Sequence, residues 1–338
     1  MAATNKAKRI PALDYVKGAL VLIMVLYHWI NYFQGPHDNR YLRFLTPSFI
    51  CITGFLISHV YFSRYGIKDP GLPKRLAERG LKLFGVFVLL NLARGLFSPP
   101  PPAAFDSPAQ SALRRIVDVY VIGTGLGGGQ YKAVAFFILV PISYLLILSA
   151  LLVFVSRFYR HTFHVACALS LLCIVAMDVR GIESGNLELL AIGLMGVIVG
   201  YLPLEKLNTL IRRPYLLGAA YLLYLGAITL WNVIYPLQIV GVCLSLLILY
   251  LLGQSSSESA RISGRIVLLG KYSLFGYIAQ IAILQMLRRG LLHVNLGPAT
   301  LAASFVAAFA LTIVSVEVVH SARAGSATVD RMYKAVFA

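Results

Sequence analysis

Long uninterrupted apolar segments are the feature of this sequence that most constrains its fold. An α-helix needs roughly 20 mainly apolar residues to cross the hydrocarbon layer of a bilayer. Measured against that length, ten segments are candidate spans, near residues 13–33, 44–62, 83–97, 133–156, 162–177, 187–202, 215–233, 237–253, 270–287 and 299–319. The sequence therefore predicts an all-α, polytopic membrane protein with about ten transmembrane helices, in which residues 1–338 form a single transmembrane domain.

The charge of the chain is explained by its orientation in the membrane. It carries 30 Lys and Arg against 13 Asp and Glu, a net charge of +17, which on a soluble chain would suggest a nucleic-acid partner. Most of these basic residues fall on one side of the membrane if the N-terminus is cytoplasmic, as the positive-inside rule expects. We therefore expect a lipid bilayer and no nucleic acid as partner, and both termini in the cytoplasm, with 320–338 as a cytoplasmic tail.

Cysteine usage indicates neither a disulfide framework nor a metal site. All four cysteines lie inside apolar segments, without a CxxC pair or a metal-ligand spacing. The first apolar segment is too long for a signal peptide and is followed by no small-residue cleavage site, so it is expected to remain as a span.

The segment 98–131 is the one long connection predicted on the outer side. It begins with Ser98 and the run Pro99–Pro102, which cannot continue a helix because proline lacks the backbone donor and clashes with the preceding turn. It ends in the glycine-rich run 123–129. We expect a lid or a re-entrant element here.

The first predicted span has a polar face. At 100° per residue, Asp14, Lys17, His28, Asn31 and Tyr32 fall within an arc of roughly 100°. An ionisable side chain at the bilayer centre costs about 2.5–3.5 kcal/mol on insertion scales, so this face is expected to line a protein or water-filled interior. His28 lies in the outer half, and its imidazole either accepts a proton during a reaction or only bonds a neighbouring helix.

Basic residues crowd the inner connection 64–82. Its core places Arg75, Arg79 and Lys82 on one face of a helix. Two interpretations remain open at this point. The cluster either contacts lipid headgroups as part of the positive-inside pattern, or it binds the phosphates of a cytoplasmic donor, for which guanidinium and ammonium groups are well suited.

Other polar residues are weaker candidates. Arg40 and Arg43, in the short outer connection after the first span, could meet an anionic acceptor. Arg94, near the end of the third span, either lines the same interior or extends outward to the interface. Glu317 and His320 could form a local pair near the inner end of the last span.

Four local patterns occur in order along the chain. Lys17 and His28 are separated by ten residues within a span that opens Leu13-Asp14-Tyr-Val-Lys17-Gly18. The others are Thr53-Gly54-Phe55-Leu56, Arg79-x-x-Lys82 and Leu269-Gly270-Lys271-Tyr272-Ser273-Leu274. Together with ten spans, these patterns resemble the acyltransferase-3 family of integral membrane acyltransferases, including its branch close to glucan succinyltransferases.

The resemblance implies an enzyme that moves an acetyl or succinyl group from a cytoplasmic acyl-CoA to a hydroxyl of a glycan or related acceptor. His28 would be the general base, Lys17 would lie near the donor phosphate or carbonyl, and Asp14 would fix Lys17. The nucleotide end of CoA would be bound by Lys74, Arg75, Arg79 and Lys82. Acyl-CoA would be a co-substrate, with no tightly bound cofactor and no metal.

On the same resemblance, the acceptor would be bound by Asn31, Tyr32, Arg40, Arg43 and Arg94. The protein would reside in a bacterial cytoplasmic (inner) membrane and could form an oligomer there. Two alternatives use the same polar and basic residues. One is a transporter or flippase of an anionic lipid or sugar, and the other is an N-acetyltransferase acting on amino sugars across the membrane.

Overall fold

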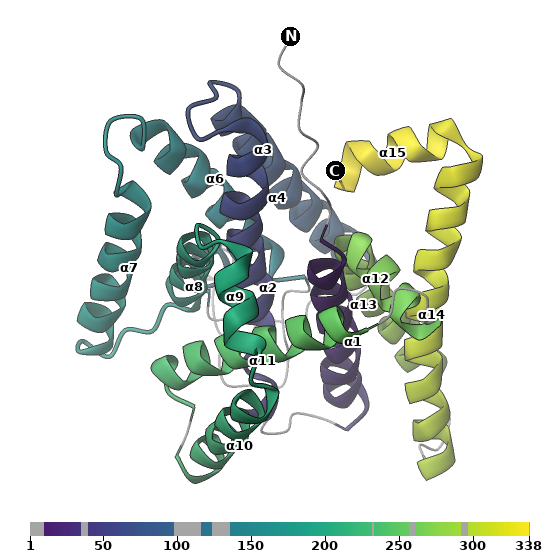
Figure 1. Cartoon of the computed structure of the whole chain (residues 1–338). Helices are drawn as coiled ribbons and strands as arrows, with labels where there is room; N and C mark the ends of the chain where they lie inside the picture. Colours follow the sequence, from purple (N-terminus) through teal and green to yellow (C-terminus); the bar gives the residue numbers. More distant parts are fainter. Residues whose placement is uncertain are drawn as a thin grey trace, which may run out of the picture. The chain divides into compact units, whose positions relative to one another are not determined.

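The computed structural model describes residues 10–34, 40–97, 116–123, 136–231, 233–256, 261–291 and 297–337. Throughout these ranges the regular elements are helices and no strand occurs, which confirms the all-α prediction. The chain, whose helices Figure 1 labels, divides into two compact units. It passes from one to the other within a helix, at Phe49–Ile50, and again between two helices, at Pro203–Leu204. The first unit contains Ile50–Pro203 and the second contains Lys8–Phe49 with Leu204–Ala338.

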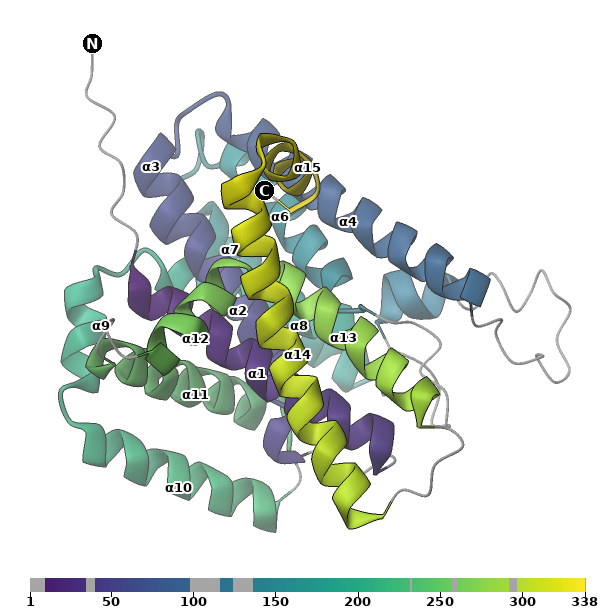
Figure 2. The ribbon, with the colours of Figure 1, turned by 90° about the vertical axis from the view of Figure 1, so that its right-hand side faces the viewer.

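In the second unit, α1 (Pro11–Phe33) is packed by the helices of the C-terminal third, as Figure 2 shows. These neighbours are α11 (Tyr235–Ser255), α12 (Arg261–Lys271), α13 (Ser273–Gly290) and α14 (Pro298–Gly325). The unit also contains η1 (Arg40–Leu42), the start of α2 (Leu45–Leu56), α9 (Leu204–Ile211), α10 (Pro214–Leu230) and α15 (Ala327–Phe337). Several of these helices begin at a proline, which is favoured in the first turn because its missing N–H has no partner there in any case.

Two glycines let α1 and α12 approach backbone to backbone. A Cβ atom on Gly18 would lie 2.0 Å from the main-chain oxygen of Ile266, and one on Gly270 would lie 1.7 Å from that of Asp14. Such distances leave no room for any side chain. The patterns at 13–18 and 269–274 therefore meet in space.

The helical path breaks directly after that contact. Tyr272 alone separates α12 from α13, and the two helix axes are bent by 97° at this point. Both helices of the bent pair contact α1.

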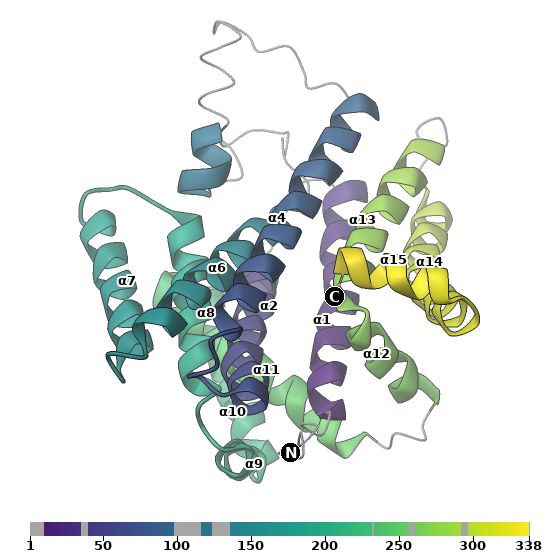
Figure 3. The same ribbon diagram turned by 90° about the horizontal axis from the view of Figure 1, so that it is seen from above.

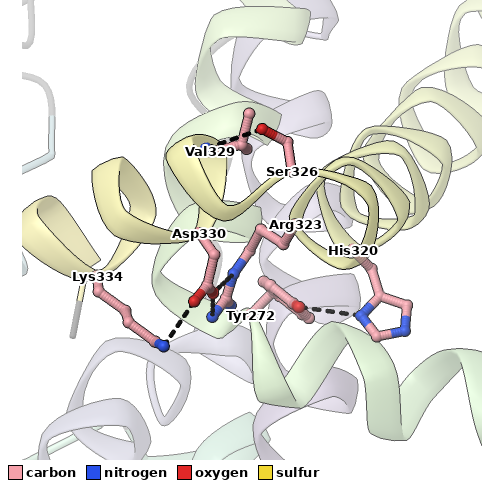
Figure 4. A network of polar contacts seen from close by, with 7 residues as sticks. All are labelled: Tyr272, His320, Arg323, Ser326, Val329, Asp330 and Lys334. Carbon is pink, nitrogen blue, oxygen red and sulfur yellow. Dashed lines mark hydrogen bonds and ion pairs between the residues drawn. The ribbon is translucent and has the colours of Figure 1, made fainter.

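The predicted C-terminal tail is an ordered helix. Figure 4 shows α15 tied to the end of α14, because Arg323 donates to Asp330 Oδ1 at 2.6 and 2.9 Å and Lys334 reaches Asp330 Oδ2 at 2.5 Å. The Arg323 guanidinium also lies 4.0 Å from the ring centre of Tyr333 and 5.3 Å from that of Tyr272. The end of the chain therefore covers the break between α12 and α13.

The expected pairing of Glu317 with His320 is wrong. Glu317 Oε1 lies 2.9 Å from Nε of Arg265, and His320 Nδ1 lies 3.0 Å from the hydroxyl of Tyr272. Both residues thus join α14 to the bent pair α12–α13. Their partners, the Arg265 guanidinium and the Tyr272 hydroxyl, are distant in sequence but lie within reach in the fold.

The first unit is built around three packed helices. α4 (Leu72–Phe97) runs beside α6 (Leu139–Val155), with Gly80 against the main chain of Ser143 (Figure 3). α8 (Gly185–Val199) packs on α6 and on α7 (Thr162–Asp178). The chain enters this unit through the end of α2, the π-helical turn η2 (Ile57–Phe62) and the short α3 (Ser63–Tyr65).

Of the segment 98–131, the structure describes only 116–123, which contain a second π-helical turn, η3 (Val117–Ile122). Asn186 donates to the main-chain oxygens of Val119 and Tyr120 at 3.1 and 3.2 Å, and Tyr144 donates to Tyr120 at 2.9 Å. Gly123 ends the turn with a φ of 72°. The rest of the predicted lid or re-entrant element lies outside the described residues, so its role stays a prediction.

Helices able to cross a membrane are present. Among the described residues, four continuous helical stretches qualify by length and composition, namely Pro11–Phe33, Arg40–Tyr65, Tyr235–Ser255 and Pro298–Gly325. The number rises to six if each of two bent helix pairs is one span. Shorter apolar helices are Leu139–Val155, Thr162–Asp178 and Pro214–Leu230. This supports an integral membrane protein, whereas the count of ten spans and the orientation of the termini stay predictions.

Candidate functional site

A buried ion pair lies at the first turns of α1. Lys17 Nζ is 2.7 Å from Asp14 Oδ1, and the two side chains are only 18% and 6% exposed. Removing either partner would leave a charge in an apolar interior, so the two side chains hold one another in place. The close contact of Gly270 with the Asp14 main chain fixes this turn of α1 against the end of α12.

The C-terminal half of the same helix also turns its polar side chains inward. His28 is partly buried, its Nε2 is enclosed, and the Tyr27 ring packs on it with the centroids 5.2 Å apart. The neighbouring Trp29 donates through Nε1 to the hydroxyl of Ser304 on α14 at 3.0 Å. Asn31 is also partly buried. The Trp29 bond therefore fixes this turn of α1 against α14, and the Tyr27 ring packs beside the imidazole.

Polar groups of α13 meet the C-terminal end of α1. Gln285 donates to the hydroxyl of Tyr32 at 3.3 Å, and the Arg288 guanidinium lies 5.7 Å from the Tyr32 ring centre. Tyr277, on the same helix, is buried. This part of α13 is therefore a second polar surface within the second unit.

Sequence reasoning did not assign Tyr277 or Gln280 to the site. Gln280, one helical turn beyond Tyr277, has no exposed surface. The signal was present in the sequence, because polar residues recur at 277, 280, 285 and 288 within an apolar segment. A helix that faced lipid on all sides would have no use for them.

In the first unit, arginines of the basic segment lie on tyrosine rings. The Arg75 guanidinium is 4.2 Å from the ring centre of Tyr65, and that of Arg64 is 5.3 Å from the same ring. Arg79 donates through Nη1 to the hydroxyl of Tyr61. The two rings belong to η2 and α3, which precede the basic helix. We call Arg64, Arg75, Arg79, Tyr61 and Tyr65 the arginine–tyrosine cluster.

The four residues predicted to bind the donor thus differ in their surroundings. Arg75 and Arg79 belong to the arginine–tyrosine cluster and remain exposed. Lys74 forms an exposed i,i+4 pair with Glu78 at 3.8 Å, and Lys82 is exposed one turn beyond Arg79. Sequence reasoning missed Tyr61 and Tyr65 here, although their i,i+4 spacing ahead of the basic run was a usable signal.

The remaining predicted acceptor residues lie elsewhere. Arg40 donates to the main chain of Thr229 on α10 at 3.5 Å, and the main chain of Arg43 accepts from Gln238 on α11 at 3.3 Å. The backbone of Arg94 belongs to α4, and its side chain lies outside the described residues. The contacts described for Arg40 and Arg43 thus anchor the connection after α1 rather than extend the polar surface around His28.

The predicted residues therefore form two groups, one in each unit. The second unit holds the ion pair, His28, Asn31 and Tyr32 on a single helix, and the first holds the exposed arginine–tyrosine cluster. The two groups differ in exposure, because the ion pair is buried and His28 partly buried, whereas the arginines of the cluster are exposed.

Comparison with known proteins identifies the family. No curated protein and no solved structure matches the chain. A family model described as an acyltransferase domain matches residues 10–317, which is nearly the whole chain and includes both groups of residues. The chain thus belongs to the acyltransferase-3 family and is a membrane acyltransferase, an enzyme that transfers acyl groups.

Proposed function

We propose that this protein transfers an acyl group, acetyl or succinyl, from a cytoplasmic acyl-CoA to a hydroxyl of a glycan or related acceptor, in a bacterial cytoplasmic membrane. The observation that carries the proposal is the polar face of α1, on which the buried Asp14–Lys17 pair and His28 both lie. The chain that carries this helix belongs to a family of acyltransferases. Each step below uses a group of this chain.

His28 is the general base. Its imidazole takes the proton of the acceptor hydroxyl while the hydroxyl oxygen attacks the thioester carbonyl. The carbon–sulfur bond then breaks, and the departing thiolate takes up the proton from the imidazolium. The result is an ester and free CoA thiol. Tyr27 and the surrounding helices keep the ring oriented, which is needed because proton transfer depends on geometry before pKa.

Lys17 supplies positive charge near the donor. Its ammonium group lies about 16 Å along the helix axis from His28, at 1.5 Å per residue. A bound acyl-CoA that extends from Lys17 towards His28 would place its phosphate end at the ammonium. Asp14 keeps the ammonium in one place, at 2.7 Å.

The arginine–tyrosine cluster binds the nucleotide end of the donor. Guanidinium groups match phosphate oxygens with two parallel hydrogen bonds. Because Arg75 and Arg79 already rest on Tyr65 and Tyr61, less side-chain freedom is lost when the phosphates bind. Lys82 adds charge on the same helix, whereas Lys74 contributes less because Glu78 opposes it.

The test is label transfer by the purified protein in lipid vesicles, from radiolabelled acetyl-CoA or succinyl-CoA to a glycan extract. His28→Ala is expected to lower the rate by roughly 10²–10⁴-fold, the usual contribution of a general base, while the protein stays folded. His161→Ala is the matched control, because His161 is an exposed histidine at the start of α7. A fully active His28→Ala variant would refute the role of the imidazole.

The product separates the remaining alternatives. Mass spectrometry distinguishes an ester from the amide that an N-acetyltransferase of amino sugars would form. A transporter is favoured by one observation, the bent pair α12–α13, since interrupted helices are typical of substrate sites in transporters. Transport of an anionic lipid or sugar would move the substrate unchanged, so a covalent acyl product excludes transport as the sole activity.

A further inference from the structure

The side-chain amide of Gln280 on α13 is buried at both its nitrogen and its oxygen. The side chain has no exposed surface, and neither Nε2 nor Oε1 has a hydrogen-bond partner among the residues that the structure describes. A buried amide without partners is unfavourable, and a membrane interior offers no bulk water to relieve it. Such a group calls for an explanation, and a catalytic role or a bound water or ion are recognised ones. A ligand hydroxyl offers the same hydrogen bonds as a water molecule.

The position of Gln280 is within the unit and not towards lipid. One turn before it, Gly276 packs against Val21 of α1 and Val316 of α14. One turn after it, Leu284 packs with Val25 of α1 and Ala308 of α14. Positions 276, 280 and 284 lie on one side of a helix. The side chain of Gln280 therefore enters the seam where α1, α13 and α14 meet.

This seam runs beside the polar face of α1. Residue numbers on the two helices increase together along their contact, from Val21 beside Gly276 to Tyr32 beside Gln285. Gln280 and His28 both lie between these two levels. The amide is thus placed along the same stretch of α1 as the imidazole.

We propose that the Gln280 amide binds a hydroxyl-bearing, uncharged part of the acyl acceptor. An amide offers a donor and an acceptor side by side, and a polyol offers the complementary pair on neighbouring hydroxyls. A phosphate or carboxylate would satisfy Nε2 but would be repelled by Oε1, so an anionic group fits less well. That the ligand is the acceptor rests on the proposed function.

The burial of Gln280 adds a condition. Because the amide has no exposed surface in this arrangement, a ligand reaches it only when the seam between α1, α13 and α14 opens. Acceptor binding is thereby coupled to a local opening between α1, which carries His28, and the helices α13 and α14. The hydroxyl groups of the acceptor reach the Gln280 amide only in the opened state.

The test uses Gln280→Met, which keeps the volume and removes the polar atoms. The full-length protein in lipid vesicles receives labelled acetyl-CoA and increasing amounts of a glycolipid and polysaccharide extract of the cells that make it. The half-saturating amount of extract is expected to rise tenfold or more, with the half-saturating acetyl-CoA concentration within twofold. Thr312→Val is the control, because Thr312 is buried in α14 but its hydroxyl already donates to Ala308.

Thermal unfolding gives a second readout that needs no chemistry. Gln280→Met alone is expected to unfold at the same or a higher temperature, because it loses an unpaired amide. The extract is expected to stabilise the wild type and Thr312→Val but not Gln280→Met. An unchanged half-saturating amount of extract, a lowered unfolding temperature of Gln280→Met, or no stabilisation of the wild type would each overturn the inference.

The two proposals fail separately. If the wild type transfers label and Gln280→Met needs no more extract, acyl transfer stands and the Gln280 site is wrong. If the wild type transfers no label but is stabilised by the extract through Gln280, the binding site stands and the proposed acyl transfer is wrong.

Discussion

Gly270 lies so close to Asp14 that a Cβ atom on the glycine would be 1.7 Å from the aspartate's main-chain oxygen. The contact joins the residue that begins the polar face of α1 to the residue that precedes the break between α12 and α13. It explains why both local patterns contain a glycine, since Gly18 makes the reciprocal approach to Ile266. The geometry of the Asp14–Lys17 pair therefore depends on a backbone contact far along the chain.

Gly270→Ala is expected to be strongly destabilising. Overpacking usually costs about 1–3 kcal/mol, and here the obstacle is backbone that cannot move aside as a side chain would. Gly218→Ala is the matched control, because Gly218 is also helical but has open space where the methyl group would lie. It should be neutral or slightly stabilising, by up to about 1 kcal/mol. Unfolding temperatures in detergent compare the two, and equal effects would contradict the close crossing.

Asp14→Asn is expected to lower both stability and activity. Breaking a buried ion pair costs about 3–5 kcal/mol when the remaining charge is fully enclosed, and less here because Lys17 is partly exposed. The double variant Asp14→Asn with Lys17→Met removes both charges and should recover much of the stability. It should not recover acyl transfer, since the donor's positive partner is gone. Recovery of transfer by the double variant would assign the pair a structural role only.

We expect the arginine–tyrosine cluster to affect the KM for the acyl-CoA donor. Tyr65→Leu removes the ring that carries Arg75 and Arg64, and a cation–π contact at an exposed site is worth about 0.5–1 kcal/mol. The KM for acyl-CoA should rise about two- to fivefold, with the half-saturating amount of acceptor unchanged. Tyr159→Leu is the control, because Tyr159 is 71% exposed. An equal change in both variants, or none in either, would contradict a donor site at the cluster.

How far the sequence predicts the structure depends on the range of each interaction. The Asp14–Lys17 pair follows from a three-residue spacing on one helix, and the inward polar face follows from helical periodicity. The contact of Gly18 with Ile266 joins distant segments, so no local pattern predicts it. The shorter apolar helices blur the count of spans, because hydropathy alone does not separate a tilted span from a buried helix.

The C-terminal helix shows the same limit. The segment 327–337 is too short for a span and contains Asp330, Arg331 and Lys334, so the sequence predicts only a tail. What orders them is a set of contacts from α14 and from the break, including Phe337 against Phe275 with ring centres 5.9 Å apart. Arg323 was visible in the sequence, but its position over two tyrosine rings depends on the bend at Tyr272.

The last prediction concerns the pH dependence of this helix. Hydrogen bonds from Lys334 and Arg323 lower the pKa of Asp330. A carboxyl whose folded pKa lies below its unfolded value, about 3.9, stabilises the folded state above that value and loses the contribution as the pH falls through the folded pKa. Asp330→Asn should therefore loosen α15 at neutral pH. The difference from the wild type should shrink as the pH falls below about 4 and vanish only below the folded pKa. Hydrogen exchange of residues 327–337 measures this, with Thr328→Ala as an exposed control on the same helix. Equal exchange in Asp330→Asn and the wild type at neutral pH would show that the aromatic contacts alone hold the helix.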